Sequence, residues 1–205
     1  MPFEAGSLSP ELAPKPRDFT SAQFKYRSTP FGKLPTTDDL LRTVRHGRSG
    51  TAMGIFNHLP EDDLRAVVEY VKFFSRKWRK AENYAAVVEI QEAPGWFGTR
   101  SEVEKRGTRG RVTFQTTCAT CHGPEGAGDG PAAPALRTEC GEPITPADLR
   151  LPRLRSGPEP RDIYRTITTG LNGTPMVGFG ETLSDEQRWE LVAYILTLQA
   201  KGSTE

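Results

Sequence analysis

The amino-acid sequence predicts an all-α fold built from two copies of one helical unit, on the strength of three observations. The segment at residues 50–71 reappears at residues 173–195, both copies end in an amphipathic helix, and no stretch shows the polar-apolar alternation of a strand. We therefore expect two tandem units, the first repeat at residues 1–80 and the second repeat at residues 97–205, joined by a linker at residues 81–96.

Residues of the same type stand at matching places in the two segments. The first repeat has Gly50, Thr51, Met53, Phe56 and Tyr70 where the second has Gly173, Thr174, Met176, Phe179 and Tyr194, the last pair after a shift of one residue. The match continues upstream, where PTTDDLLRTVRHG parallels PEPRDIYRTITTG. Each copy is therefore expected to be one structural unit.

Each copy is expected to close with a helix that has one buried face. In the second repeat Ser184 and Gln187 make a capping box at the helix start. Apolar residues follow at helical spacing, at Trp189, Val192, Ala193 and Leu196. In the first repeat Pro60 stands at the favoured first helical position. The apolar positions there are Leu64, Val67, Val68 and Val71.

A further helix is expected just before the cysteines. One of its faces carries Val103, Gly107, Gly110 and Phe114. The two glycines would let the backbone of another helix approach closely. Between the helices lie long segments rich in Pro and Gly, such as residues 123–136, and loops of that length inside a compact unit usually wrap a ligand.

The composition excludes several classes of protein. The 205 residues carry a net charge of +1, so nucleic acid is not an expected partner. We expect no transmembrane segment in this chain, and its first residues lack the basic start and apolar run of a signal peptide. Since Cys140 is left over once Cys118 and Cys121 are assigned, a disulfide scaffold is not expected either.

The segment TTCATCHGPEGAGDG, residues 116–130, carries the strongest chemical signal. Cys118 and Cys121 are followed directly by His122, which is the attachment signature of c-type haem. Two thiols about one helical turn apart can each form a thioether with a porphyrin vinyl group, and the adjacent imidazole then points at the iron. Haem c is the expected cofactor.

Three other interpretations of the cysteines stay open. A structural zinc site needs four ligands, which would be Cys118, Cys121 and Cys140 with one of His122, His58 or His46. A thioredoxin-like dithiol needs a strand before the cysteine pair, and the pattern has none. The two cysteines can also simply be buried.

Met176 is the expected second axial ligand of the iron. Met53 and Met176 occupy equivalent places in Gly-Thr-x-Met loops, just before the terminal helix of each repeat. A methionine often fills a core, but a repeated loop methionine downstream of a haem motif favours a ligand. His122 and Met176 would occupy both faces of the iron, which favours an electron carrier over an enzyme.

On these residues the chain resembles the class I c-type cytochromes, over residues 101–199. The resemblance rests on Gly110 and Phe114 before the attachment site, Cys118, Cys121 and His122 in it, Met176 as sixth ligand, and Leu191 and Tyr194 packing on Gly110. The segments CHGPEGAGDGPAA, GEPITPADLR and GTPM are also similar to tandem dihaem cytochromes of bacterial respiratory chains. The chain departs from that subgroup at Cys140, where an aromatic residue is often found.

This resemblance implies transfer of single electrons between redox protein partners, an oxidoreductase or oxidase, in the periplasm or another extracytoplasmic location. The alternative is a haem-bearing subunit of a larger oxidoreductase complex, with the first repeat as its docking module. A zinc-binding adaptor is a third class.

The first repeat resembles the same domain but is incomplete. Aligning the copies places its missing CxxCH a few residues before Met1, so that Met53 is a candidate ligand of a second haem without an attachment site in this chain. We expect that the polypeptide extends upstream, with an export signal and a first CxxCH, in preference to a unit that has lost its haem. His46 and His58 align with non-ligands of the second repeat and are expected at the surface.

Overall fold

The computed structural model describes residues 14, 16–157 and 159–202, and within them the chain is helical. These residues form no β-strand, only two isolated bridges. The α-helices are α1 (Thr37–His46), α2 (Glu61–Phe73), α3 (Arg100–Thr117), α4 (Ala119–His122), α5 (Pro160–Thr169) and α6 (Asp185–Gly202). Short 3₁₀ turns are η1 (Arg76–Arg79), η2 (Ala81–Asn83), η3 (Gly95–Gly98) and η4 (Ala133–Ala135). The predicted all-α class is confirmed.

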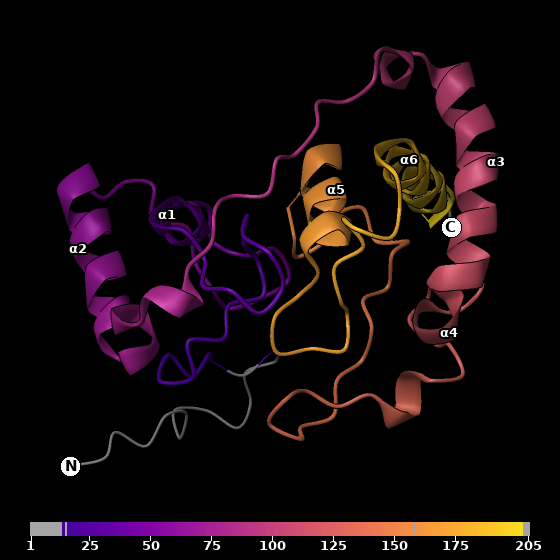
Figure 1. Cartoon of the computed structure of the whole chain (residues 1–205). Coiled ribbons are helices and arrows are strands. Elements are labelled where there is room, and N and C mark those ends of the chain that lie inside the picture. Colours follow the sequence, from indigo (N-terminus) through magenta and orange to yellow (C-terminus); the bar gives the residue numbers. More distant parts are fainter. Residues whose placement is uncertain (1–13, 15, 158, 203–205) are drawn as a thin grey trace.

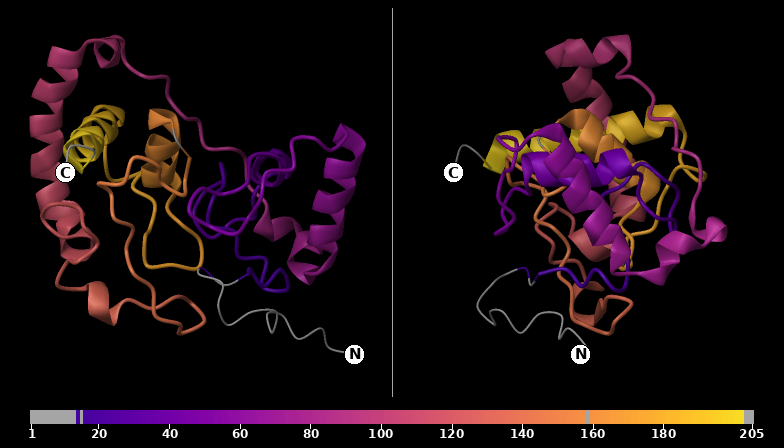
Figure 2. Two further views of the ribbon diagram at one scale, coloured as in Figure 1. Left: turned by 180° about the vertical axis from the view of Figure 1, so that it is seen from behind. Right: turned by 90° about the vertical axis from the view of Figure 1, so that its left-hand side faces the viewer.

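Two groups of helices lie side by side, joined by the extended segment that leads to η3 and α3 (Figures 1 and 2). Helices α1 and α2 pack together in one group, and α3, α5 and α6 form the other. Buried apolar side chains gather in two clusters, one drawn from residues 22–78 and one from residues 114–198. None of the described helices combines the length and apolar character needed to cross a membrane.

Helices α3 and α6 cross at Gly110. A Cβ atom placed there would lie only 1.9 Å from the carbonyl oxygen of Glu190, so the two backbones touch. Phe114, fully buried on the same face of α3, packs against Tyr194 with ring centroids 5.1 Å apart. The expected glycine face of this helix is confirmed, because only glycine allows so close an approach.

Helix α6 is buried more completely than its periodicity predicts. The capping box of Ser184 and Gln187 is present at its start, with hydrogen bonds of 2.9 and 3.2 Å. All residues from Trp189 to Ile195 are buried, not one stripe of them, and Leu196 is only partly buried. The reason is position: α6 packs against both α3 and α5, so neighbours cover opposite sides of the helix.

Helix α2 is less buried than its periodicity predicts. Leu64 and Val68 are in the core, but Val67 is 42% exposed, Tyr70 63% and Phe73 74%. The expectation that Val67 is buried is wrong, because no described helix covers this face of α2, which lies at the outer edge of the molecule (Figure 1). The matching residues of α6, Leu191 and Tyr194, are buried.

Helices α1 and α5 are built alike, at matching places in the two repeats. Both span ten residues and both begin with a capping box whose third helical residue is an aspartate, Asp39 in α1 and Asp162 in α5. Each aspartate also pairs with an arginine three residues on, Arg42 or Arg165. Each helix stops at a glycine with positive φ, which the sharp turn into the following methionine loop requires.

Candidate functional site

The CxxCH segment forms a tight turn at the end of α3. The Cys118 N–H donates to the carbonyl of Phe114 at 2.8 Å, and the N–H of His122 donates to the carbonyl of Cys118 at 2.9 Å. Helix α4 thus brings Cys118, Cys121 and His122 into one helical turn. Both thiols are free and half-buried, so they are chemically open to thioether formation.

The Cys118 thiol does not have the acidity that a redox dithiol needs. Burial raises the pKa of Cys118 to about 11, and the neighbouring Cys121 adds a smaller effect in the same direction. Catalytic Cys-x-x-Cys pairs need the opposite, a cysteine whose pKa is lowered so that thiolate forms near neutral pH. The arrangement therefore disfavours the thioredoxin-like interpretation.

The imidazole of His122 is held for ligation through one nitrogen. Its Nδ1 lies 3.2 Å from the carbonyl oxygen of Ala147, and a carbonyl can only accept, so Nδ1 carries the proton. The other nitrogen, Nε2, is left as the basic atom that a metal takes. Burial lowers the pKa of His122, which favours the neutral, ligating form.

The glycine-rich segment after His122 folds back on the attachment turn. Gly128 donates to the carbonyl of His122 at 2.8 Å, and Gly130 donates to the carbonyl of Cys121 at 3.2 Å. Gly128 has a φ of +83°, and a Cβ there would lie 2.5 Å from the carbonyl oxygen of Pro146. The segment that carries Ala147 is thereby held beside His122.

The loops that carry Met53 and Met176 share one hydrogen-bonding pattern. In the second repeat, Leu171 N–H donates to the Met176 carbonyl at 2.9 Å, and Met176 N–H donates to Thr174 Oγ1 at 3.2 Å. In the first repeat, Arg48 N–H donates to the Met53 carbonyl at 3.2 Å, and Met53 N–H donates to Thr51 Oγ1 at 3.1 Å. The sequence match thus extends to the backbone of the loops, although Met53 is more exposed than Met176.

The remaining candidate ligands stay apart. Cys140, His46 and His58 are all exposed, as expected for the two histidines. Across the described residues no three His, Cys, Asp or Glu side chains come together as a metal-binding group. The four-ligand zinc site is therefore not assembled in this part of the chain.

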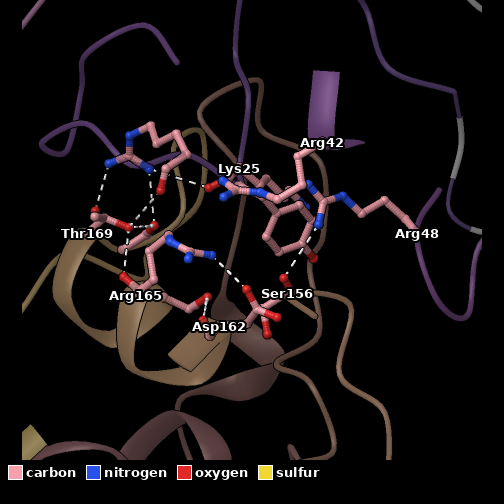
Figure 3. Close-up of a pocket in the computed structure, with 11 residues that line it drawn as sticks. Lys25, Arg42, Arg48, Ser156, Asp162, Arg165 and Thr169 are labelled. Atoms are coloured by element: carbon pink, nitrogen blue, oxygen red, sulfur yellow. Dashed lines mark hydrogen bonds and ion pairs between the residues drawn. The ribbon is translucent and has the colours of Figure 1, made fainter. Parts of the chain in front are cut away.

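A feature that the sequence reasoning missed is a basic pocket between the two groups of helices (Figure 3). Its charged lining residues are Lys25, Arg27, Arg42, Arg48, Asp162 and Arg165. Arg27 is fully buried and donates to the carbonyls of Thr169 and Gly170 at 2.7 and 3.1 Å, which satisfies the C-terminal end of α5. The matching arginines Arg42 and Arg165 were the one sequence signal for this pocket.

The residues at the CxxCH turn fit haem c on chemical grounds. Two free thiols stand one turn apart beside an imidazole whose Nδ1 is committed to a carbonyl, and the Met176 loop has a backbone fixed by hydrogen bonds. Thiol, imidazole and thioether are the protein groups that c-type haem uses.

Known proteins share both the sequence and the fold. Residues 105–195 match the family described as Cytochrome C oxidase, cbb3-type, subunit III. Among solved structures, a chain of the Kuenenia stuttgartiensis reducing HAO-like protein complex Kustc0457/Kustc0458 is 36% identical, with a TM-score of 0.85. The alignment covers 94% of this chain and 86% of that chain. The comparison with curated proteins finds no match.

Proposed function

Because the chain belongs to the c-type cytochromes, we propose that it carries single electrons through one haem c held by Cys118, Cys121, His122 and Met176. The observation that carries this proposal is the His122 imidazole, whose Nδ1 faces the Ala147 carbonyl at 3.2 Å beside two free thiols. Haem c supplies a one-electron ferric/ferrous couple when bound.

The protein residues would do three things for that couple. Cys118 and Cys121 would hold the porphyrin covalently, and the Ala147 carbonyl orients the His122 ring, which would make its other nitrogen a stronger ligand. The Met176 thioether would be the second protein ligand of the iron and would favour the reduced state, which raises the reduction potential. If His122 and Met176 both bound the iron, no coordination site would be left for a substrate, and the domain would act as a carrier of electrons.

The experiment is intact mass of protein produced with haem-maturation machinery. Under denaturing conditions the mass should exceed that of the polypeptide by whole haem units. Cys118→Ala and Cys121→Ala should each remove one thioether and lower the haem yield. Cys140→Ala is the matched control, because Cys140 is exposed and outside the turn. An unmodified mass in the unchanged protein would overturn the proposal.

A second candidate is a haem-bearing subunit of an oxidoreductase complex. It is favoured by the similarity to a chain of the HAO-like complex, which extends over 94% of this chain, and by the exposed apolar residues Val67, Tyr70 and Phe73 on α2. The first repeat would then be the docking module for an HAO-like partner. We expect the native mass of the protein purified from its own source to exceed the mass of one chain. The Tyr70→Glu variant should have the native mass of a single chain.

Met53 is proposed as the ligand of a second haem in a longer form of the polypeptide. Its loop repeats the hydrogen bonds of the Met176 loop, and the exposed face of α2 matches the face of α6 that packs on α3. A helix like α3, carrying a first CxxCH, would cover that face and complete two tandem haem domains, so in this case the face would not be the docking surface of the second candidate. The in-frame sequence upstream of Met1 should encode this motif and an export signal to the periplasm; a stop codon without the motif would leave the first repeat as a haemless module.

A further inference from the structure

The basic pocket holds more positive charge than the surrounding residues neutralise. Five cationic side chains line it, together with a single carboxylate, Asp162. Two of the cations have ion-pair partners, since Arg42 pairs with Asp39 and Arg165 pairs with Asp162 at 2.6 Å. Among the described residues, neither Lys25 nor Arg48 makes an ion pair with a carboxylate.

Arg48 carries the clearest sign of a missing partner. Its guanidinium lies 4.4 Å from the centre of the Tyr26 ring and donates through Nη1 to the Ser156 carbonyl at 3.4 Å and through Nη2 to Thr43 Oγ1. Its Nε is buried and has no hydrogen-bond acceptor among the described residues. A buried charged donor without an acceptor is costly, so an acceptor is expected in the pocket.

The electrostatics of the neighbouring groups point the same way. Burial lowers the pKa of Lys25, and the nearby cations Arg17 and Arg155 lower it further. Burial also lowers the pKa of Arg48, against smaller opposing effects that include the two aspartates. Burial is the largest cause of both pKa shifts, and a carboxylate bound beside these two cations would oppose it.

The pocket lies against both methionine loops. Gly170, one of its lining residues, is packed so closely on the Met176 loop that a Cβ there would lie 2.7 Å from the Met176 carbonyl oxygen. On the other side, the backbone of Arg48 holds the Met53 carbonyl at 3.2 Å. In Figure 3 Lys25, Arg42 and Arg48 face Arg165, Asp162 and Thr169 of α5 across the pocket.

We propose that this basic pocket binds the propionate carboxylates of the haem attached at Cys118 and Cys121, with Arg48 and Lys25 as their cationic partners. The propionates are the anionic groups of that haem, and guanidinium groups bind carboxylates with strong, charge-assisted hydrogen bonds. The first repeat would thus supply cations to a cofactor that the second repeat carries. The inference rests on the proposed function.

The test uses the holoprotein with Arg48→Gln and Lys25→Gln. Arg76→Gln is the matched control, because it removes the same charge from an exposed residue of η1 that does not line the pocket. Lys25→Gln also guards against misfolding, because the Lys25 side chain makes no hydrogen bond to another described residue, whereas Arg48 makes two. The readouts are intact mass, reduction potential and the carboxylate bands of redox-difference infrared spectra.

We expect every variant to keep its haem by mass. Arg48→Gln and Lys25→Gln should lower the reduction potential and shift a propionate band, because loss of a cation favours the ferric state and frees a carboxylate. Arg76→Gln should leave the band in place. If both pocket variants carry haem and the propionate band does not shift in either, the pocket assignment alone is wrong. If the unchanged protein has the unmodified mass of the polypeptide, both the proposed function and this inference are wrong.

A binding experiment with inorganic phosphate distinguishes two possible occupants of the basic pocket, the haem carboxylates and a free anion. If propionates fill the pocket, the holoprotein should bind phosphate no better than Arg48→Gln does. Phosphate binding to the holoprotein that Arg48→Gln abolishes would mean that the pocket is open to free anions, and the proposal would be wrong.

Discussion

Gly110 of α3 and Glu190 of α6 meet backbone to backbone, with 1.9 Å between the place of a Gly110 Cβ and the Glu190 carbonyl oxygen. This contact joins the helix that ends in the attachment turn to the terminal helix of the chain. It fixes the place of the CxxCH turn relative to the core of the second repeat.

Replacing Gly110 should therefore separate the two helices. We expect Gly110→Ala to lower the free energy of unfolding by about 1–3 kcal/mol or more, since neither backbone can give way easily. Gly107→Ala is the matched control one turn earlier, where a Cβ meets atoms of Ala193 and Thr197 at 3.4–3.5 Å, an ordinary contact. It should be neutral or stabilise by up to about 1 kcal/mol through helix propensity. Urea unfolding checks both, and equal losses would contradict the close crossing.

Removing Arg27 should weaken the contact between the repeats. Arg27→Leu leaves the buried Thr169 carbonyl without its donor, at a cost of about 1–3 kcal/mol, and leaves the Gly170 carbonyl with Thr169 Oγ1 at 3.3 Å as its remaining donor. Arg76→Leu, at an exposed arginine, should change stability by less than about 0.5 kcal/mol. Chemical denaturation of the holoproteins measures the difference, and similar stabilities of the two variants would count against the role of Arg27.

The aspartate in the capping box of α1 should matter more than its neighbour. Asp39 is buried and accepts hydrogen bonds from the backbone N–H groups of Ser28 and Thr36, at 2.8 and 3.0 Å. Asp39→Ala would leave both donors unpaired and should cost about 2–4 kcal/mol. Asp38→Ala, in the same helical turn but exposed, should cost no more than about 1 kcal/mol from the helix dipole. The prediction fails if thermal unfolding ranks the two variants the other way.

The two methionines should differ in their effect on the haem of this chain. Met176→Ala should abolish the weak charge-transfer band of Met-ligated ferric haem and lower the reduction potential. Met53→Ala should leave the spectrum of a one-haem protein unchanged and is the matched control, since its loop has the same hydrogen bonds. Visible spectra and potentiometric titration decide the matter. If the band survives in Met176→Ala, another residue is the axial ligand.

Several features of the molecule could be predicted from local sequence patterns alone. The glycine face of α3 and the capping box of α6 follow from spacing within a single helix, and the structure has both. The CxxCH turn is local as well, because three of its residues lie within one helical turn. Self-comparison of the chain also matched the two methionine loops, whose backbones have the same hydrogen bonds.

Features that depend on packing between distant segments were decided only by the tertiary structure. Val67 has the spacing of a core residue yet is exposed, and α6 is buried on nearly all sides, because burial depends on how many neighbouring helices cover a face. The basic pocket gathers Lys25, Arg48 and Arg165 from positions far apart in the chain. The helical period of the sequence predicts which residues share one face of a helix. Long-range packing decides which element covers that face and which charged side chains come together between elements.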